Sequence, residues 1–311
     1  MASIFHYTDA VGLSGILQSD SLFASDYRFL NDASEMRIVR DLLLPVFETE
    51  IAELMPRLIQ KGWVKGFYEF HGQSGHRLQA EGFFKTLIRL LNEVSPLFVL
   101  SFCRHDEGTE EFTHGLLSQW RGYGNAGGFA IEFDEIRIDE LLKAEMENCA
   151  YAGWKSEEVI YEDYNKLFRI EDFKGVAGEM IRRMFEPRDV SEITGKKDID
   201  RFMATFMTVA PFMKHSGFRE EREYRVVFSC IHRDKRPDDE TRESKEINFR
   251  VKHGQVVPYI EVFAHGPSLP IKSIIVGPHP SQELQYEAVK LMLSEEGIDA
   301  TVRLSEIPYR G

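Results

Sequence analysis

The chain has 311 residues, of which 43% are hydrophobic and 12% aromatic, so it can bury a large core and is not extensively disordered. Its formal net charge of -13 argues against a protein that coats nucleic acid through overall charge, although a local basic groove remains compatible with it. The three cysteines are odd in number and far apart, which predicts no disulfide framework and indicates a reducing compartment.

The first residues lack the basic and apolar regions of a signal peptide. The best apolar run, residues 97–102, has the length of a strand and is too short to span a membrane. We therefore expect a cytoplasmic protein with no membrane partner.

The first third of the chain predicts a strand over residues 3–7, a helix capped by Thr8 or Asp9, and a short strand over residues 22–25. Residues 34–93 are mostly helical in pattern, with a break at the glycines of residues 72–75.

The rest of the chain predicts a strand over residues 97–102, followed by further strands and helices. The further strands are expected at 129–133, 224–230, 259–264, 271–277 and 301–307, with helices over about 135–215 and after Ser281 and a charged loop at 231–246. Together these elements predict a single α+β domain over residues 1–311. It would have a mixed β-sheet core and helical insertions at about 36–95 and 135–215.

Glu221 and Glu223 lie two residues apart in a segment that has a strand pattern. Because side chains alternate along a strand, we expect both carboxylates on one face with Arg225, roughly 7 Å apart. Such a pair can hold a ribose hydroxyl, stabilise a cationic sugar and act as a base. The alternative is a solvated edge strand on which Glu and Arg form ion pairs.

Polar residues also follow the first two predicted strands. His6 and Thr8 lie at the end of the first strand, where they could line a cleft or serve as a structural residue and a helix cap. Asn31 follows apolar Phe29 and Leu30, and a buried amide there would need a protein or ligand partner.

Trp120, Arg121 and Tyr123 precede a glycine-rich loop. An aromatic ring beside a guanidinium can stack on a ligand ring and bind a phosphate. Packing of Trp120 in the core, with Arg121 paired to an acid, is an equally good interpretation. The loop has neither a Walker nor a dinucleotide-binding pattern. Metal-ligand spacings and a serine nucleophile motif do not occur, so we expect no metal.

The segments occur in a specific order: His6-Tyr7-Thr8, Phe29-Leu30-Asn31-Asp32, Ser118 to Gly124, Gly128 to Ile131, Phe218 to Arg225 and Ile275 to Pro278. This series of blocks resembles the DUF2971 family over nearly the whole chain. The family name carries no function.

The chain is also similar, more weakly, to ADP-ribosyltransferase folds of the DarT type, which begin with a His-x-Thr strand, a helix and a short strand ending in Ser. That resemblance implies an NAD-dependent ADP-ribosyltransferase or NAD glycohydrolase, such as occurs in phage defence or toxin systems. Glu223 would be catalytic and Glu221 would orient or activate the acceptor. NAD would contact seven further residues: His6, Tyr7, Thr8, Asn31, Trp120, Arg121 and Tyr123.

Three other functions remain open from the sequence. A nucleotide-binding sensor would use the same cleft without turnover. A nucleic-acid-processing or binding module would need a basic groove, for which Arg182-Arg183 and Lys196-Lys197 are too short. A structural interaction protein would leave the Glu and Trp segments as packing and salt bridges. The acceptor, whether nucleic acid, protein or water, and the oligomeric state are not fixed by the sequence.

Overall fold

The computed structural model describes residues 3–30, 35–61, 65–72, 74–123, 128–162, 164, 204, 206, 208–231, 240–252 and 254–308. It separates into two compact units. Unit 1 is built from residues 1–29, 98–159 and 218–311, and unit 2 from residues 30–97 and 160–217. Asn31 and the two basic pairs at 182–183 and 196–197 lie outside the described residues. None of the helices in the described ranges is long and apolar enough to cross a membrane.

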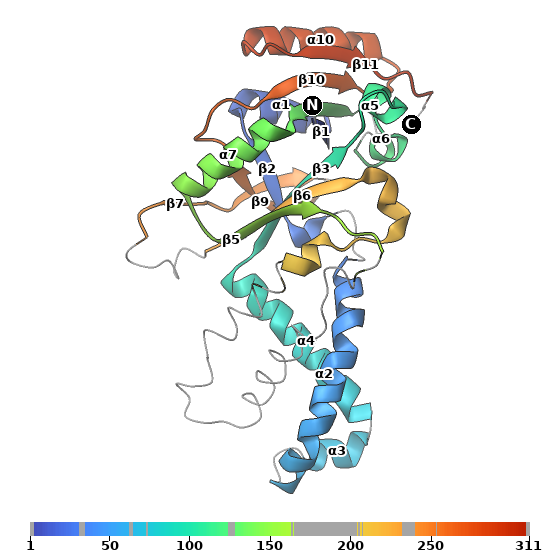
Figure 1. Cartoon of the computed structure of the whole chain (residues 1–311), viewed down its shortest axis with the longest axis vertical. Coiled ribbons are helices and arrows are strands. Elements are labelled where there is room, and N and C mark those ends of the chain that lie inside the picture. The colour runs from blue at the N-terminus through green and yellow to red at the C-terminus, as the bar shows by residue number, and fades with distance from the viewer. Residues whose placement is uncertain are drawn as a thin grey trace. The chain divides into compact units, whose positions relative to one another are not determined.

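Unit 1 is organised around a mixed β-sheet with helices against it (Figure 1). The main strand order is β11-β10-β4-β1-β3-β2-β9-β8; β6 pairs with β3 and β5, and β7 pairs with β5. The strands are β1 (Ser3–Thr8), β2 (Leu22–Asp26), β3 (Leu97–Arg104), β4 (Phe129–Asp134), β5 (Cys149–Glu158), β6 (Glu223–Cys230), β7 (Glu243–Ser244), β8 (Asn248–Lys252), β9 (Gln255–Val262), β10 (Ile271–Val276) and β11 (Thr301–Leu304).

Alternation along β1 supplies two different cores. Ile4 belongs to the larger apolar cluster, which includes buried side chains of α1 (Ala10–Ser19), α7 (Glu135–Asn148) and α10 (Gln282–Glu295). Phe5 and Tyr7 point to the opposite face and join a smaller cluster with Trp120 of α6 (Leu117–Tyr123). The first strand is therefore buried on both faces, which explains its apolar sequence.

The described part of unit 2 is mainly helical. It contains α2 (Glu35–Gln60), α3 (Lys65–His71) and α4 (Ser74–Val94), and Gly72 has the positive φ of 55° that ends α3. Phe47 of α2 packs edge-on against Phe83 of α4, with ring centroids 5.0 Å apart. The helical insertion expected at about 36–95 therefore corresponds to three helices in this unit.

Two expectations from the sequence need correction. Residues 149–158 form strand β5 inside the stretch expected to be helical, because Cys149, Ala150 and Tyr151 are buried and the strand pairs with β6. Ser281 precedes α10 as expected, but its side chain makes no capping hydrogen bond. The expected cap of α1 is present, since the Asp9 carboxylate accepts from the Gly12 amide at 2.8 Å.

Candidate functional site

His6 lies where β3 changes its neighbour. β3 pairs with β1 at Cys103 and Arg104 and with β2 at Phe98 and Val99. Ser101 falls between these paired stretches, and its carbonyl lies 2.9 Å from Nδ1 of His6. A carbonyl oxygen only accepts hydrogen bonds, so Nδ1 must carry the proton.

The charge state of His6 follows from its surroundings. Burial lowers the pKa of His6 to about 4; the hydrogen bond to Ser101 opposes this shift, and the positive charges of Arg250 and Lys252 add to it. The imidazole is therefore neutral near pH 7, with Nδ1 donating to Ser101. This tautomer makes Nε2 a hydrogen-bond acceptor, which suits a ribose hydroxyl or an amide N–H.

Tyr7 takes part in a buried hydrogen-bond chain on the opposite face of β1. The Leu116 amide donates to the Tyr7 hydroxyl at 2.8 Å, and that hydroxyl lies 2.9 Å from Nε2 of His105. Burial also lowers the pKa of His105 to about 4, so its ring is neutral in the hydrogen bond with Tyr7. Tyr7 thus holds the chain around Leu116 against β1.

Trp120 is only 1% exposed and belongs to the smaller core cluster. Its ring packs edge-on against Tyr7 at 5.0 Å, and its indole N–H donates to the His114 carbonyl at 3.1 Å. A Cβ added to Gly277 would come within 2.9 Å of the Trp120 ring and 2.8 Å of the Gly128 carbonyl. The sequence pattern around Trp120 and Gly277 is therefore explained by close packing.

The other members of the Trp120 and Thr8 segments are placed differently. Arg121 is exposed on α6, and the side chain of Tyr123 lies outside the described residues. Thr8 is buried, and a Cβ on Gly12 would collide with its hydroxyl oxygen. Contacts to a ligand by Tyr7, Thr8, Trp120 and Arg121 stay predictions, while core packing accounts for the positions of Tyr7 and Trp120.

Glu223 begins β6 and is 5% exposed. Its two carboxylate oxygens accept from Nε and Nη2 of Arg225 at 2.7 and 2.9 Å, a bidentate ion pair between alternate residues of one strand. The alternative interpretation of this segment expected Glu and Arg to form ion pairs along one face of a solvated edge strand. The ion pair is present, but the strand that carries it is buried. A carboxylate held in this way is fixed and negatively charged.

Glu221 does not share a strand face with Glu223, contrary to the expectation from the sequence. It ends the 3₁₀ helix η5 (Ser216–Glu221), and β6 starts two residues later. Arg222 between them has a φ of 43°, a left-handed conformation that breaks strand alternation. Glu221 is nevertheless buried, close in sequence to Glu223.

The structure adds a basic group that the sequence did not reveal. Arg250 and Lys252 of β8 lie close enough to His6 of β1 to lower its pKa, although 244 residues separate His6 from Arg250 in the chain. Arg250 Nη2 donates to the Ser25 hydroxyl of β2 at 2.8 Å. Side chains from β1, β2 and β8 therefore converge on one polar region.

Two further buried carboxylates are also outside the sequence prediction. Glu132 of β4 accepts from Ser3, Ser273 and Arg303 at 2.8, 2.5 and 3.0 Å, and pairs with Lys272 at 3.2 Å. Burial would raise the pKa of Glu132, but the hydrogen bonds from Ser273, Ser3 and Lys272 outweigh it and lower that pKa. Through these partners, Glu132 links β4 to β1, β10 and β11.

Glu145 of α7 has the same character. It accepts from the Tyr151 hydroxyl at 2.6 Å and from the Phe263 amide at 3.0 Å, and it pairs with Lys245 at 2.6 Å. This carboxylate joins α7 and β5 to the segment that follows β9.

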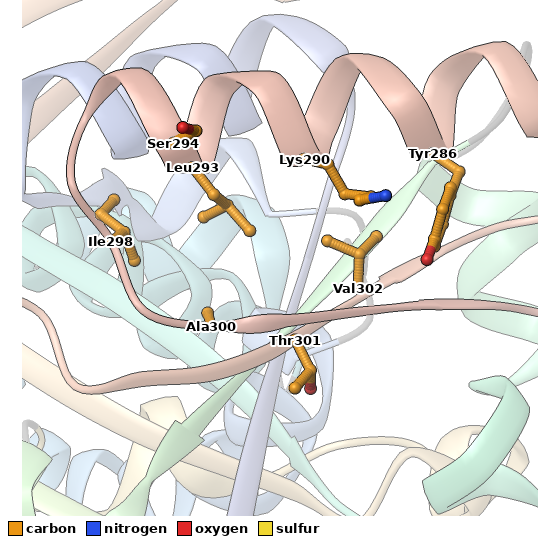
Figure 2. Close-up of a pocket in the computed structure, with 8 residues that line it drawn as sticks. All are labelled: Tyr286, Lys290, Leu293, Ser294, Ile298, Ala300, Thr301 and Val302. Atoms are coloured by element: carbon orange, nitrogen blue, oxygen red, sulfur yellow. The ribbon is translucent and has the colours of Figure 1, made fainter.

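A surface pocket of about 440 Å³ lies between α10 and β11 (Figure 2). Tyr286, Lys290 and Leu293 of the helix point toward Val302 of the strand there. None of the residues singled out from the sequence lines this pocket. Among the residues that the structure describes, no three His, Cys, Asp or Glu side chains converge as metal ligands. The convergence of His6, Ser25 and Arg250 is therefore the better candidate site.

Comparison with known proteins gives one family. A family model described as "Protein of unknown function (DUF2971)" matches residues 119–226. No curated protein matches the chain, and no solved structure does. The matched segment includes Trp120, Gly128 and the Glu221 to Arg225 segment, and excludes the blocks around His6 and Gly277. Over residues 119–226, the match supports the resemblance to the DUF2971 family that the motifs indicated.

Proposed function

We propose that this protein binds NAD beside His6 and breaks its N-glycosidic bond, as an ADP-ribosyltransferase or an NAD glycohydrolase. The observation that carries the proposal is the neutral His6 ring, fixed by the Ser101 carbonyl where β3 changes its neighbour from β1 to β2. Its Nε2 can accept a hydrogen bond from a ribose hydroxyl, a group that every nucleotide offers.

The chemical step needs a fixed negative charge near the sugar. As the bond between the ribose C1′ and the nicotinamide nitrogen breaks, its electron pair leaves with nicotinamide and C1′ becomes cationic. We assign the stabilising carboxylate to Glu223, which Arg225 keeps ionised and oriented. An acceptor oxygen then bonds to C1′ and gives its proton to Glu221, which would serve as the base.

A sensor that binds NAD without turnover is the second candidate. The observation that favours it is that Arg225 engages both oxygens of Glu223, whose side chain is almost fully buried. A carboxylate in that position is well suited to hold a strand in place. Such a protein would bind NAD through His6 and release no nicotinamide.

The test follows nicotinamide release from NAD by the purified protein, with water alone and with protein and nucleic-acid acceptors. We expect release that Glu223→Gln reduces by at least about 100-fold, in line with loss of an electrostatic catalytic group. Glu283→Gln, which neutralises an exposed glutamate on α10, is the control and should retain full activity.

Because Glu223 is paired with Arg225, the melting temperature of each variant must be measured beside its activity. The double variant Glu223→Gln/Arg225→Met removes both charges and provides a folded background without the carboxylate. Full release by this folded double variant would contradict the role of Glu223. Binding of NAD with no release by the wild type would overturn the enzyme and establish the sensor.

A further inference from the structure

β8 carries two basic side chains on one face. Arg250 lies opposite Val257 of β9, and Lys252 lies opposite Gln255. Because the two cations are two residues apart on one strand, their side chains point to the same face. The intervening Val251 and the preceding Phe249 point to the other face and are 77% and 66% exposed. The strand therefore turns its charged side chains toward the protein and leaves apolar ones in solvent.

Arg250 is held in a defined position by β2 and β9. Its Nη2 donates to Ser25 at 2.8 Å, and its guanidinium carbon lies 5.7 Å from the ring centroids of both Phe23 and Tyr259. These two rings pack on each other at 4.5 Å. A guanidinium fixed by a hydroxyl and two aromatic rings loses little further freedom when it binds a ligand.

The basic groups repel one another. Burial lowers the pKa of Lys252, and the charge of Arg250 lowers it further, while Asp9 acts in the opposite direction. Arg250 and Lys252 also disfavour protonation of His6. A bound anion would be attracted to the two cations that β8 carries on one face.

We propose that Arg250, Lys252 and Ser25 form a phosphate subsite that takes the pyrophosphate of a nucleotide. The guanidinium fork of Arg250 fits two phosphate oxygens, Lys252 adds a second charge, and the Ser25 hydroxyl, which accepts from Arg250, has its own proton to donate. His6 takes the adjoining ribose. The subsite deepens the proposed function, on which the assignment of the ligand as a nucleotide rests.

The test is calorimetric titration with ADP-ribose, inorganic pyrophosphate and nicotinamide riboside, the last of which lacks phosphate. Lys252→Gln and Arg250→Gln should each weaken binding of ADP-ribose and of pyrophosphate by about tenfold or more, and leave nicotinamide riboside unaffected. Lys290→Gln on α10, which removes an exposed lysine from the same unit, should change none of these affinities. Lys252→Gln keeps the proposal testable if Arg250→Gln does not fold.

The outcomes separate this subsite from the proposed function. Pyrophosphate binding that requires Arg250 and Lys252, with no binding or cleavage of NAD, would establish the subsite and overturn the proposed function. Cleavage of NAD with unchanged ADP-ribose affinity in a folded Arg250→Gln/Lys252→Gln variant would overturn the subsite and leave the proposed function standing.

Discussion

His6 serves the fold through one ring nitrogen and leaves the other as a hydrogen-bond acceptor. Its Nδ1 satisfies a strand carbonyl that lies between the stretches of β3 paired with β1 and β2. Its Nε2 is the acceptor that the proposed nucleotide would use. Acceptance at Nε2 needs the neutral ring, because a protonated imidazole would donate from both nitrogens. The charges of Arg250 and Lys252 also disfavour the protonated ring.

The neutral state of His6 predicts an acid-sensitive fold. The folded protein takes up this proton only near pH 4, whereas an unfolded histidine does so near pH 6.5. Between these values the unfolded state binds more protons, so the free energy of unfolding should fall as the pH falls, by up to about 3 kcal/mol from this residue. Denaturant unfolding at several pH values between 7.5 and 4.5 measures it.

His6→Asn is the matching variant, since its amide can still donate to the Ser101 carbonyl but does not titrate. It should flatten the pH dependence in proportion to the contribution of His6. His105, whose pKa burial also lowers to about 4, will keep part of the slope. An identical slope in His6→Asn and wild type would contradict the lowered pKa, because it would mean that His6 takes up its proton at the same pH in the folded and unfolded states.

At the scale of single elements, β6 carries a buried ion pair in its first three residues. Removal of one partner should leave a buried charge without its counter-ion, and Arg225→Met should lower the free energy of unfolding by about 3–5 kcal/mol. The double variant Glu223→Gln/Arg225→Met should recover most of that loss, because neither charge remains. A double-mutant cycle by denaturant unfolding measures the coupling. Additive effects of the two substitutions would contradict a direct pair.

Most strands and helices could be predicted because apolar residues recur with a clear period. β1, β4, β6 and β10 have dense apolar sequences, and α1 and α10 show helical spacing. β5 was missed because its second half is polar and mostly outside the larger core. The prediction for Glu221 and Glu223 was wrong because sequence periodicity cannot detect the left-handed residue Arg222 between them.

β8 explains why the basic part of the candidate site could not be predicted. Its alternation suggests that Phe249 and Val251 are buried, whereas they are exposed and Arg250 faces Ser25. β8 ends the main strand order and pairs with β9, and its Phe249 and Val251 side chains are exposed. His6 could be selected from the sequence as a polar residue at a strand end, but its basic partners come from the other end of the chain.

At the scale of the molecule, unit 1 is assembled from three separate chain segments. A fragment ending at Glu158 would contain β1 to β5 but would lack β6, β9 and β10. These missing strands pair with β3, β2 and β4, respectively. We expect this fragment to show no cooperative unfolding transition, since its strands lose partners and its core loses the side chains of α10. Near-ultraviolet circular dichroism during thermal unfolding, compared with the full chain, provides the measurement. A sharp transition in the fragment would mean that its segments fold alone.

The order of strands has a consequence for how quickly this protein can fold. Ser25 pairs with Tyr259, and Ile131 pairs with Ile274, so neighbouring strands must meet across more than a hundred intervening residues. Closing such long loops has an entropic cost before any strand contact offsets it, which places unit 1 among slow folders. Until β9 and β10 have been synthesised, the edges of β2 and β4 with which they pair are exposed to other chains. Newly made protein therefore faces its greatest risk of aggregation before its last strands have been added.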